Sequence, residues 1–123
     1  MTYSTDTTIG VGAAKFNGLT SCLEVPHIRS DLFKTPYTLN LWVYPDDSGR
    51  AILFGDHQLT GGVSMNFELK NGGELRYYHG GSPDKTFTKT IIAPGKWTMI
   101  TLTYDGTKLV AYLNGTKTEE YQF

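Results

Sequence analysis

The sequence has little of what several functional classes require. It contains a single cysteine, Cys22, so no disulfide can form within the chain. Eleven Lys and Arg residues balance twelve Asp and Glu residues, for a formal net charge of −1, which favours neither nucleic acid nor an anionic membrane as a partner. No apolar run is long enough to span a bilayer, so we expect no membrane insertion.

Motifs for common catalytic sites are also missing. The three histidines, His27, His57 and His79, are scattered without partners at metal-ligand spacing, and there is no G-x-S-x-G nucleophile motif. The first ten residues, MTYSTDTTIG, lack the basic and apolar regions of a signal peptide. We expect these ten residues to form a loose polar arm, and we interpret Cys22, close to Leu23 and Val25, as a small core residue.

What the sequence does contain is a clear β pattern near its C-terminal end. Two apolar runs, Trp97–Tyr104 and Thr107–Leu113, are followed by the turn-forming pairs Asp105-Gly106 and Asn114-Gly115. Asx-Gly pairs favour type I′ turns, in which both central residues have positive φ. The pattern predicts an antiparallel hairpin that continues through a second tight turn into a third strand over Thr116–Gln122.

The rest of the chain repeats this alternation of short strands and turns. Apolar and polar residues alternate in several segments, and no amphipathic helix of ordinary length is visible. The predicted strands are Thr20–Val25, Tyr37–Tyr44, Arg50–Gly55, Val63–Lys70, Glu74–His79 and Thr86–Ile92. Strands with turn signals about every 8–12 residues predict an all-β fold, an antiparallel two-sheet sandwich of jelly-roll type, formed by residues 1–123 as one domain.

Three segments, in order, resemble one known family. They are Ala14–Gly18 followed by Cys22–Pro26, then Tyr37–Pro45 with its central Trp42, and then Thr103–Gly106 with Tyr112–Gly115. This ordered set is similar to the laminin G-like and concanavalin A-like lectin/glucanase domains. The resemblance covers roughly residues 12 to 117 and implies their β-sandwich fold. It says less about function, because this fold hosts lectins, hydrolases, adhesion modules and scaffolding domains.

The sequence departs from the family pattern at its end. Laminin G-like domains continue beyond the Asn-Gly turn into closing strands, whereas this sequence ends at Phe123. If the resemblance holds, the sandwich has an unpaired edge and an apolar seam. The sequence is then either a fragment of a longer chain, or its sheet is completed by a neighbouring chain or a second copy in a homo-oligomer.

The hydrolase members of this superfamily carry closely spaced carboxylates, in an E-x-D-x-x-E arrangement on one strand. No such spacing occurs here: Glu68 and Glu74 are separated by a turn, and Glu119 and Glu120 are adjacent and therefore on opposite faces. We therefore expect the protein not to be an enzyme.

Seven residues on the outward positions of the predicted strands suit a shallow glycan site. Aromatic side chains can stack on sugar rings, and planar polar groups can hydrogen-bond to hydroxyls. The aromatic candidates are Trp42, Tyr44 and Tyr78, and the polar ones are Asn40, Asn66, Glu68 and Arg76. A second interpretation stays open, in which Trp42 and Tyr44 pack beneath a loop or against a missing strand. Trp97, which begins a strand, is expected to support the core.

The resemblance also implies a calcium option, since several laminin G-like domains bind one ion at a loop rim. The candidates are Asp46, Asp47 and Asp56, which offer hard oxygen ligands near glycine-rich loops. The alternative is that Asp46-Asp47-Ser48-Gly49 simply forms a turn. No other cofactor is expected.

Two functions follow from these observations. The first is a non-enzymatic carbohydrate-binding or adhesion module that recognises a glycan or a protein surface, located outside the cell, on a cell surface or on a virion. The second is a structural or assembly domain, on a phage particle or in a bacterial surface protein, that makes protein contacts through its sheet edges.

Overall fold

A computed structural model describes residues 2–5, 7, 9–25, 35–56, 65–79 and 84–122; for Asp56 and His79 only the backbone is considered. Its described residues form strands and connecting turns, with no helix long and apolar enough to cross a membrane. The strands are β1 (Thr2–Ser4), β2 (Ala13–Lys15), β3 (Tyr37–Val43), β4 (Ala51–Asp56), β5 (Met65–Leu69), β6 (Glu74–His79), β7 (Lys85–Ile91), β8 (Thr98–Tyr104), β9 (Lys108–Leu113) and β10 (Thr116–Gln122).

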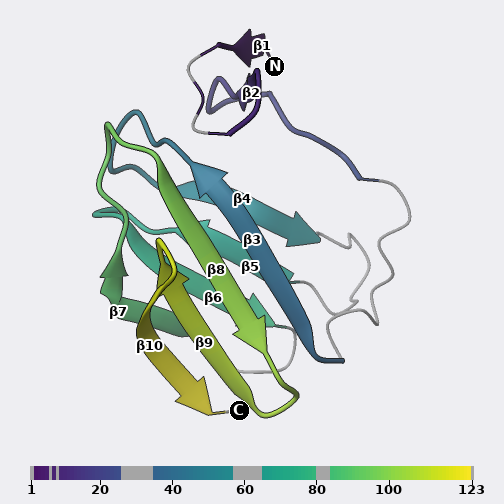
Figure 1. Ribbon diagram of the computed structural model, residues 1–123, viewed down its shortest axis with the longest axis vertical. Coiled ribbons are helices and arrows are strands. Elements are labelled where there is room, and N and C mark those ends of the chain that lie inside the picture. Colours follow the sequence, from purple (N-terminus) through teal and green to yellow (C-terminus); the bar gives the residue numbers. More distant parts are fainter. Residues whose placement is uncertain are drawn as a thin grey trace.

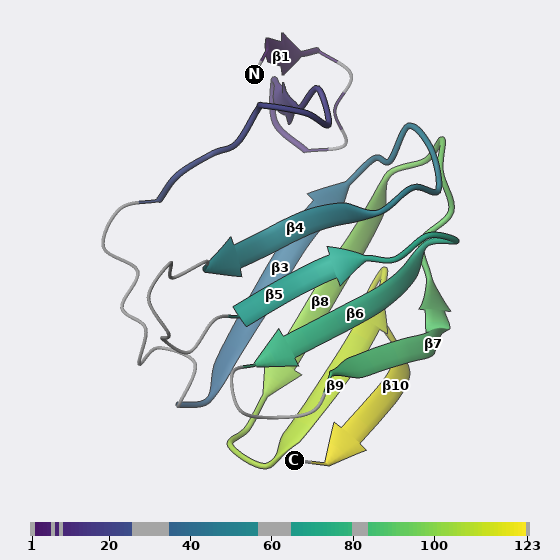
Figure 2. The same ribbon diagram turned by 180° about the vertical axis from the view of Figure 1, so that it is seen from behind.

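Eight of these strands form two four-stranded antiparallel sheets that face each other (Figure 1). The front sheet has the order β10-β9-β8-β3, and the back sheet, nearest the viewer in Figure 2, has the order β4-β5-β6-β7. Within the sandwich, β3 is the first strand and belongs to the front sheet. The next four strands, β4 to β7, form the back sheet, and β8 then pairs with β3 in the front sheet. The predicted all-β, two-sheet sandwich is therefore confirmed.

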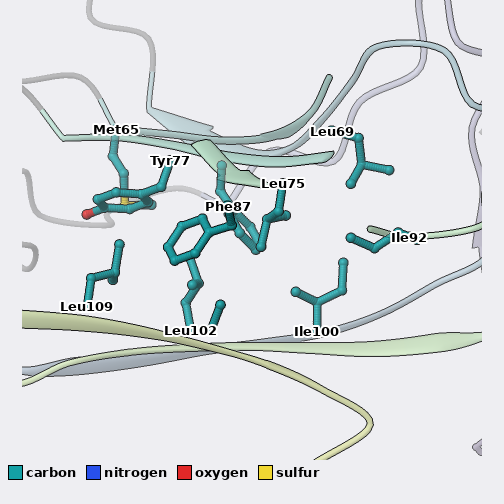
Figure 3. Packing of buried hydrophobic residues seen from close by; sticks show 11 residues of the cluster. Met65, Leu69, Leu75, Tyr77, Phe87, Ile92, Ile100, Leu102 and Leu109 are labelled. Atoms are coloured by element: carbon teal, nitrogen blue, oxygen red, sulfur yellow. The ribbon is translucent and has the colours of Figure 1, made fainter. Parts of the chain in front are cut away.

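The core lies between the two sheets and follows from the period-two pattern of each strand. Inward side chains of the back sheet, such as Leu75, Tyr77 and Phe87, meet Ile100, Leu102 and Leu109 of the front sheet (Figure 3). All six are at most 1% exposed. The predicted inward residues of β3, which are Tyr37, Leu39, Leu41 and Val43, pack against this cluster but remain partly buried. The outward residues of both sheets therefore point away from each other, on opposite sides of the molecule.

The two predicted tight turns differ in outcome. Asn114 (φ 51°) and Gly115 (φ 81°) both have positive φ, as a type I′ turn requires, so that prediction is confirmed. Asp105 does not, and only Gly106 (φ 104°) lies in the left-handed region of the other turn. Asp105 Oδ1 instead accepts hydrogen bonds from the backbone N–H of Thr107 at 2.9 Å and of Lys108 at 2.7 Å. The backbone N–H of Asp105 also donates to the Lys108 carbonyl at 3.2 Å, so the two central residues of the turn are Gly106 and Thr107, one residue later than predicted. The Asp105 side chain stabilises this turn and is not at its centre.

One side of the sandwich is closed by bonds between β7 and β10. The Lys89 backbone N–H donates to Glu119 Oε2 at 2.9 Å, and the Tyr121 hydroxyl donates to the Thr86 carbonyl at 2.7 Å. The Tyr121 ring also packs edge-on against Phe87, with centroids 5.0 Å apart. These contacts join the two sheets at that side.

The N-terminal region differs from expectation. Thr20–Val25, predicted as a strand, has no strand structure; Asn17 Oδ1 accepts hydrogen bonds from the N–H groups of Leu19, Thr20 and Ser21, which makes a local turn instead. Cys22 is exposed and is not a core residue. Thr2–Ser4, within the predicted loose arm, pairs with Ala13–Lys15, and this small β1–β2 hairpin lies beyond one end of the sandwich in both views (Figures 1 and 2).

The remaining strand predictions are close. β6 has the predicted bounds, while β3, β4 and β7 differ by a residue or so at their ends. Val63 and Ser64 of the predicted Val63–Lys70 strand lie outside the described residues, as do His27 and His57.

Candidate functional site

The structure divides the seven predicted ligand-binding residues between two opposite faces. Asn40, Trp42 and Tyr44 belong to β3 and its end, on the outer face of the front sheet. Asn66, Glu68, Arg76 and Tyr78 belong to β5 and β6, on the outer face of the back sheet. Because the core lies between the sheets, these two groups point in opposite directions and cannot contact one small ligand together.

The front face presents an aromatic patch, which consists of Trp42, Tyr44 and Trp97. Trp42 is 37% exposed and Tyr44 is 40% exposed, so each side chain is partly supported and partly open to solvent. The Trp97 ring packs edge-on against Tyr44, with centroids 5.6 Å apart and an interplanar angle of 60°. Trp97 was predicted to support the core, but it is not part of the core cluster and instead supports an exposed ring on the outer face.

Polar groups lie beside the aromatic patch on the same face. Asn40 is two residues from Trp42 on β3, and therefore shares its face about 7 Å away along the strand. The Asn40 side-chain amide donates to Thr101 Oγ1 at 2.6 Å, which fixes its orientation and leaves Oδ1 and the second N–H for another partner. Tyr112, opposite Thr101 on β9, continues this polar row across the sheet. Flat rings beside oriented donors and acceptors match the requirements for sugar binding.

Glu68 does not have the exposed position that its alternation predicted. It lies on the outer face of the back sheet, but it is only 1% exposed because two arginines cover it. Arg50 Nη2 lies 2.8 Å from Glu68 Oε2, and Arg76 Nε lies 2.7 Å from Glu68 Oε1. Arg76 also approaches Asp84 Oδ2 at 3.3 Å. Both carboxylate oxygens of Glu68 are therefore occupied, and the side chain links β5 to β6 and to Arg50, the residue just before β4.

Asn66 and Tyr78 are cross-strand neighbours on this back face, and both are half-buried. The amide of Asn66 lies over Gly55 of β4, where an added Cβ would meet Asn66 Oδ1 at 2.7 Å. Because Gly55 has no side chain, the Asn66 amide can lie over it. This role of Gly55 follows from the pairing register of β4 and β5 and is not visible in the sequence. This face is a network of ion pairs and packed polar groups, with less open aromatic surface than the front face.

The three aspartates proposed for calcium do not lie together. Asp47 Oδ1 accepts a hydrogen bond from the Gly49 N–H at 2.6 Å, which is the turn geometry of the alternative interpretation. Asp46 and Asp47 precede β4 and Asp56 ends it, so the length of the strand, about 17 Å for five residue steps, lies between the two positions. Within the described part of the chain, no three metal-binding side chains form a group.

A shallow hollow of about 330 Å³ lies at the other end of β3, and sequence reasoning missed it. Tyr37, Tyr104, Asp105 and Lys108 are among its lining residues. The Tyr37 hydroxyl shares a hydrogen bond with the Tyr77 hydroxyl, and burial raises the pKa of Tyr37 to about 12. Burial also raises the pKa of Tyr77, because the charged form of either phenol would be poorly solvated at the core.

A comparison with protein families matches residues 17–123 to the model of the concanavalin A-like lectin/glucanases superfamily. The chain belongs to this superfamily. The match extends through all the strands of both sheets and confirms the resemblance that the ordered motifs indicated. Searches among curated proteins and among solved structures gave no match.

Membership defines a class of domain without naming a ligand. Concanavalin A-like domains often bind carbohydrate or mediate adhesion, and laminin G-like members are typically non-enzymatic binding modules. The ligand of this concanavalin A-like domain has to be inferred from the residues on the outer faces of its own two sheets.

Proposed function

We propose that this concanavalin A-like domain is a non-enzymatic module that binds carbohydrate through the outer face of its front sheet. The observation that carries the proposal is the aromatic patch, where two half-exposed rings lie beside the oriented amide of Asn40. A sugar ring on Trp42 would place its hydroxyls near Asn40, Thr101 and Tyr112, which offer both donors and acceptors. We propose that the module acts at a cell or particle surface.

The outer face of the back sheet is less suited to sugar binding than the outer face of the front sheet. On that face the buried carboxylate of Glu68 is engaged by Arg50 and Arg76, and Tyr78 is half-buried. The same engagement argues against hydrolysis, which needs a pair of available carboxylates flanking the substrate. Among the described residues, Glu119 is likewise occupied, by the Lys89 N–H and the Tyr121 hydroxyl. We therefore expect no cleavage of laminarin-type glucans.

The test is a glycan array, followed by calorimetric titration of the best ligand with three proteins. Trp42→Ala should weaken binding about tenfold or more, because it removes the stacking surface, which is worth about 1 kcal/mol beyond its buried area. Tyr78→Ala, a matched truncation on the opposite face, should bind as the wild type does. Thermal melting of both variants checks that each remains folded.

The outcomes separate the candidate functions. Loss of binding in Tyr78→Ala with normal binding in Trp42→Ala would move the site to the back face. A wild-type protein that binds no glycan on the array would refute the proposal and favour the assembly function.

A further inference from the structure

Three of the four sheet edges carry features that prevent pairing with another strand. β10 has the charged residues Lys117, Glu119 and Glu120 and a register shift between Lys117 and Glu119. β7 has two lysines, and its edge is bound by the side chains of Glu119 and Tyr121. β4 has a register shift between Ile52 and Phe54. Charges, bulges and covered backbone groups are the usual means by which proteins protect sheet edges.

β3 has none of these features. Its seven residues, YTLNLWV, include no charged residue and no proline, and its register against β8 is unbroken from Tyr37 to Val43. No strand among the described residues pairs with its outer edge. In an antiparallel sheet, alternate residues of an edge strand direct their backbone N–H and C=O groups outward. The stretch from Thr38 to Val43 therefore offers a regular, uncharged template for another strand.

The side chains beside this edge are also incompletely covered. Leu39, Leu41 and Val43 are only partly buried, whereas Ile100 and Leu102, their neighbours on β8, are 0% exposed. The inward residues of β4, the neighbouring edge of the back sheet, are likewise only partly buried. An added strand at β3 would cover this apolar side of the sandwich.

We propose that the strand added at this edge is β3 of a second copy of this chain, paired antiparallel about a two-fold axis at Asn40. The two front sheets then form one continuous sheet of eight strands. The proposal rests on the edge and not on the aromatic patch. In the dimer the remaining amide atoms of Asn40 face the partner's Asn40, so a sugar stacked on Trp42 would be bound by Thr101 and Tyr112.

The sequence of β3 is self-complementary in this register. On the inner side, Leu39 lies opposite the partner's Leu41, and Tyr37 lies opposite the partner's Val43. On the outer side, Thr38 lies opposite the partner's Trp42, so no like charges meet. Asn40 lies opposite the partner's Asn40. The N–H not used by Thr101 can donate to the partner's Oδ1, and the Asn40 Oδ1 can accept from the partner's N–H, reciprocally across the axis.

Such pairing changes the outer face as well. The two copies of Trp42 would lie about 14 Å apart on one surface, from four residue steps along the strand and one strand spacing across. The paired surface would then present two aromatic patches to one extended partner.

The test uses charge at the axis. In a dimer of this register, position 40 faces itself, so Asn40→Lys and Asn40→Asp should each weaken self-association about fivefold or more, measured by sedimentation equilibrium. An equimolar mixture of the two variants should restore association, because Lys and Asp then face each other. The matched control, Thr88→Lys, adds the same charge at an exposed position of β7 and should dimerise like the wild type.

Each alternative outcome overturns the proposal. A wild-type protein that stays monomeric at all accessible concentrations would do so, as would a dimer in which the Asn40 variants and their mixture behave like the wild type. Amide exchange of Thr38–Val43 identifies another occupant. If these amides are protected in a monomer and lose protection when residues 1–25 are deleted, the chain's own N-terminal segment covers the edge.

Discussion

Glu68 provides the sharpest test of how the back sheet is held together. Glu68→Gln preserves the volume of the side chain and removes its charge. The carboxylate is 1% exposed and is bound by Arg50 on one oxygen and by Arg76 on the other. In the variant, one oxygen becomes an NH₂ group that faces a guanidinium, so one charge-assisted contact is replaced by two opposed donors.

The magnitude follows from the exposure of the partners. A hydrogen bond to a charged group is worth about 1.5–3 kcal/mol, and breaking a fully buried ion pair costs about 3–5 kcal/mol. The side chains of Arg50 and Arg76 are 59% and 29% exposed, so water can solvate the guanidinium that loses its partner. We therefore expect the lower value, a loss of about 2 kcal/mol in the free energy of unfolding, or about 8 °C in melting temperature.

Urea denaturation followed by tryptophan fluorescence, with calorimetric melting, measures this loss. The matched control is Glu74→Gln, on the same face, whose carboxylate lies 3.5 Å from Lys70 Nζ and is one-third exposed. A surface pair of this kind contributes about 0.5 kcal/mol or less. Equal and small effects in the two variants would refute the structural role of Glu68. If Glu68→Gln lost glycan binding without losing stability, Glu68 would be a ligand-binding residue, as the sequence predicted.

Two further predictions concern the aspartates. Hydrogen bonds from the Thr107 and Lys108 backbone lower the pKa of Asp105, so its carboxylate stabilises the folded state above the unfolded pKa, and this contribution is lost as the pH falls through the lowered folded pKa. The stability difference between wild type and Asp105→Asn should therefore be present at neutral pH and shrink as the pH falls below about 3.8, and a difference that persists unchanged into acid would contradict this. Calcium should leave the melting temperature at its value in chelator, because Asp47 is engaged by Gly49 and Asp56 lies at the far end of β4; a calcium-dependent rise that disappears in Asp47→Asn would establish a site.

The sequence predicts the sandwich well because its strands are patterned locally. The alternation in Tyr37–Val43 and in Met65–Leu69 assigns the inner and outer side chains correctly, and the Asn114-Gly115 turn has the positive φ values that these residue types favour. These properties depend on residues close together in the chain. The Thr20–Val25 prediction failed because its alternation is short and Asn17 forms competing hydrogen bonds.

The candidate site was less predictable because it depends on which sheet receives each strand. Asn40 and Asn66 have the same outward signal in the sequence, yet one lies on the front face and the other on the back face. The burial of Glu68 depends on Arg50, the residue just before the neighbouring strand β4, which periodicity within β5 cannot reveal. Alternation predicts that a side chain points outward, but only the strand order tells which outward residues share a face.

The pairing of β3 with β8 has a consequence for how the chain reaches its native state. Tyr37 pairs with Tyr104 and Val43 with Thr98, so more than fifty residues must be ordered or looped before this ladder closes, whereas β8, β9 and β10 are joined by short turns. Contacts so distant in sequence form slowly, because the entropy of closing the loop is lost before the contacts form. During synthesis, β3 leaves the ribosome well before its partner exists, with its apolar, uncharged face uncovered. The early chain is therefore most vulnerable to aggregation at YTLNLWV, and chaperone capture of nascent chains should concentrate there.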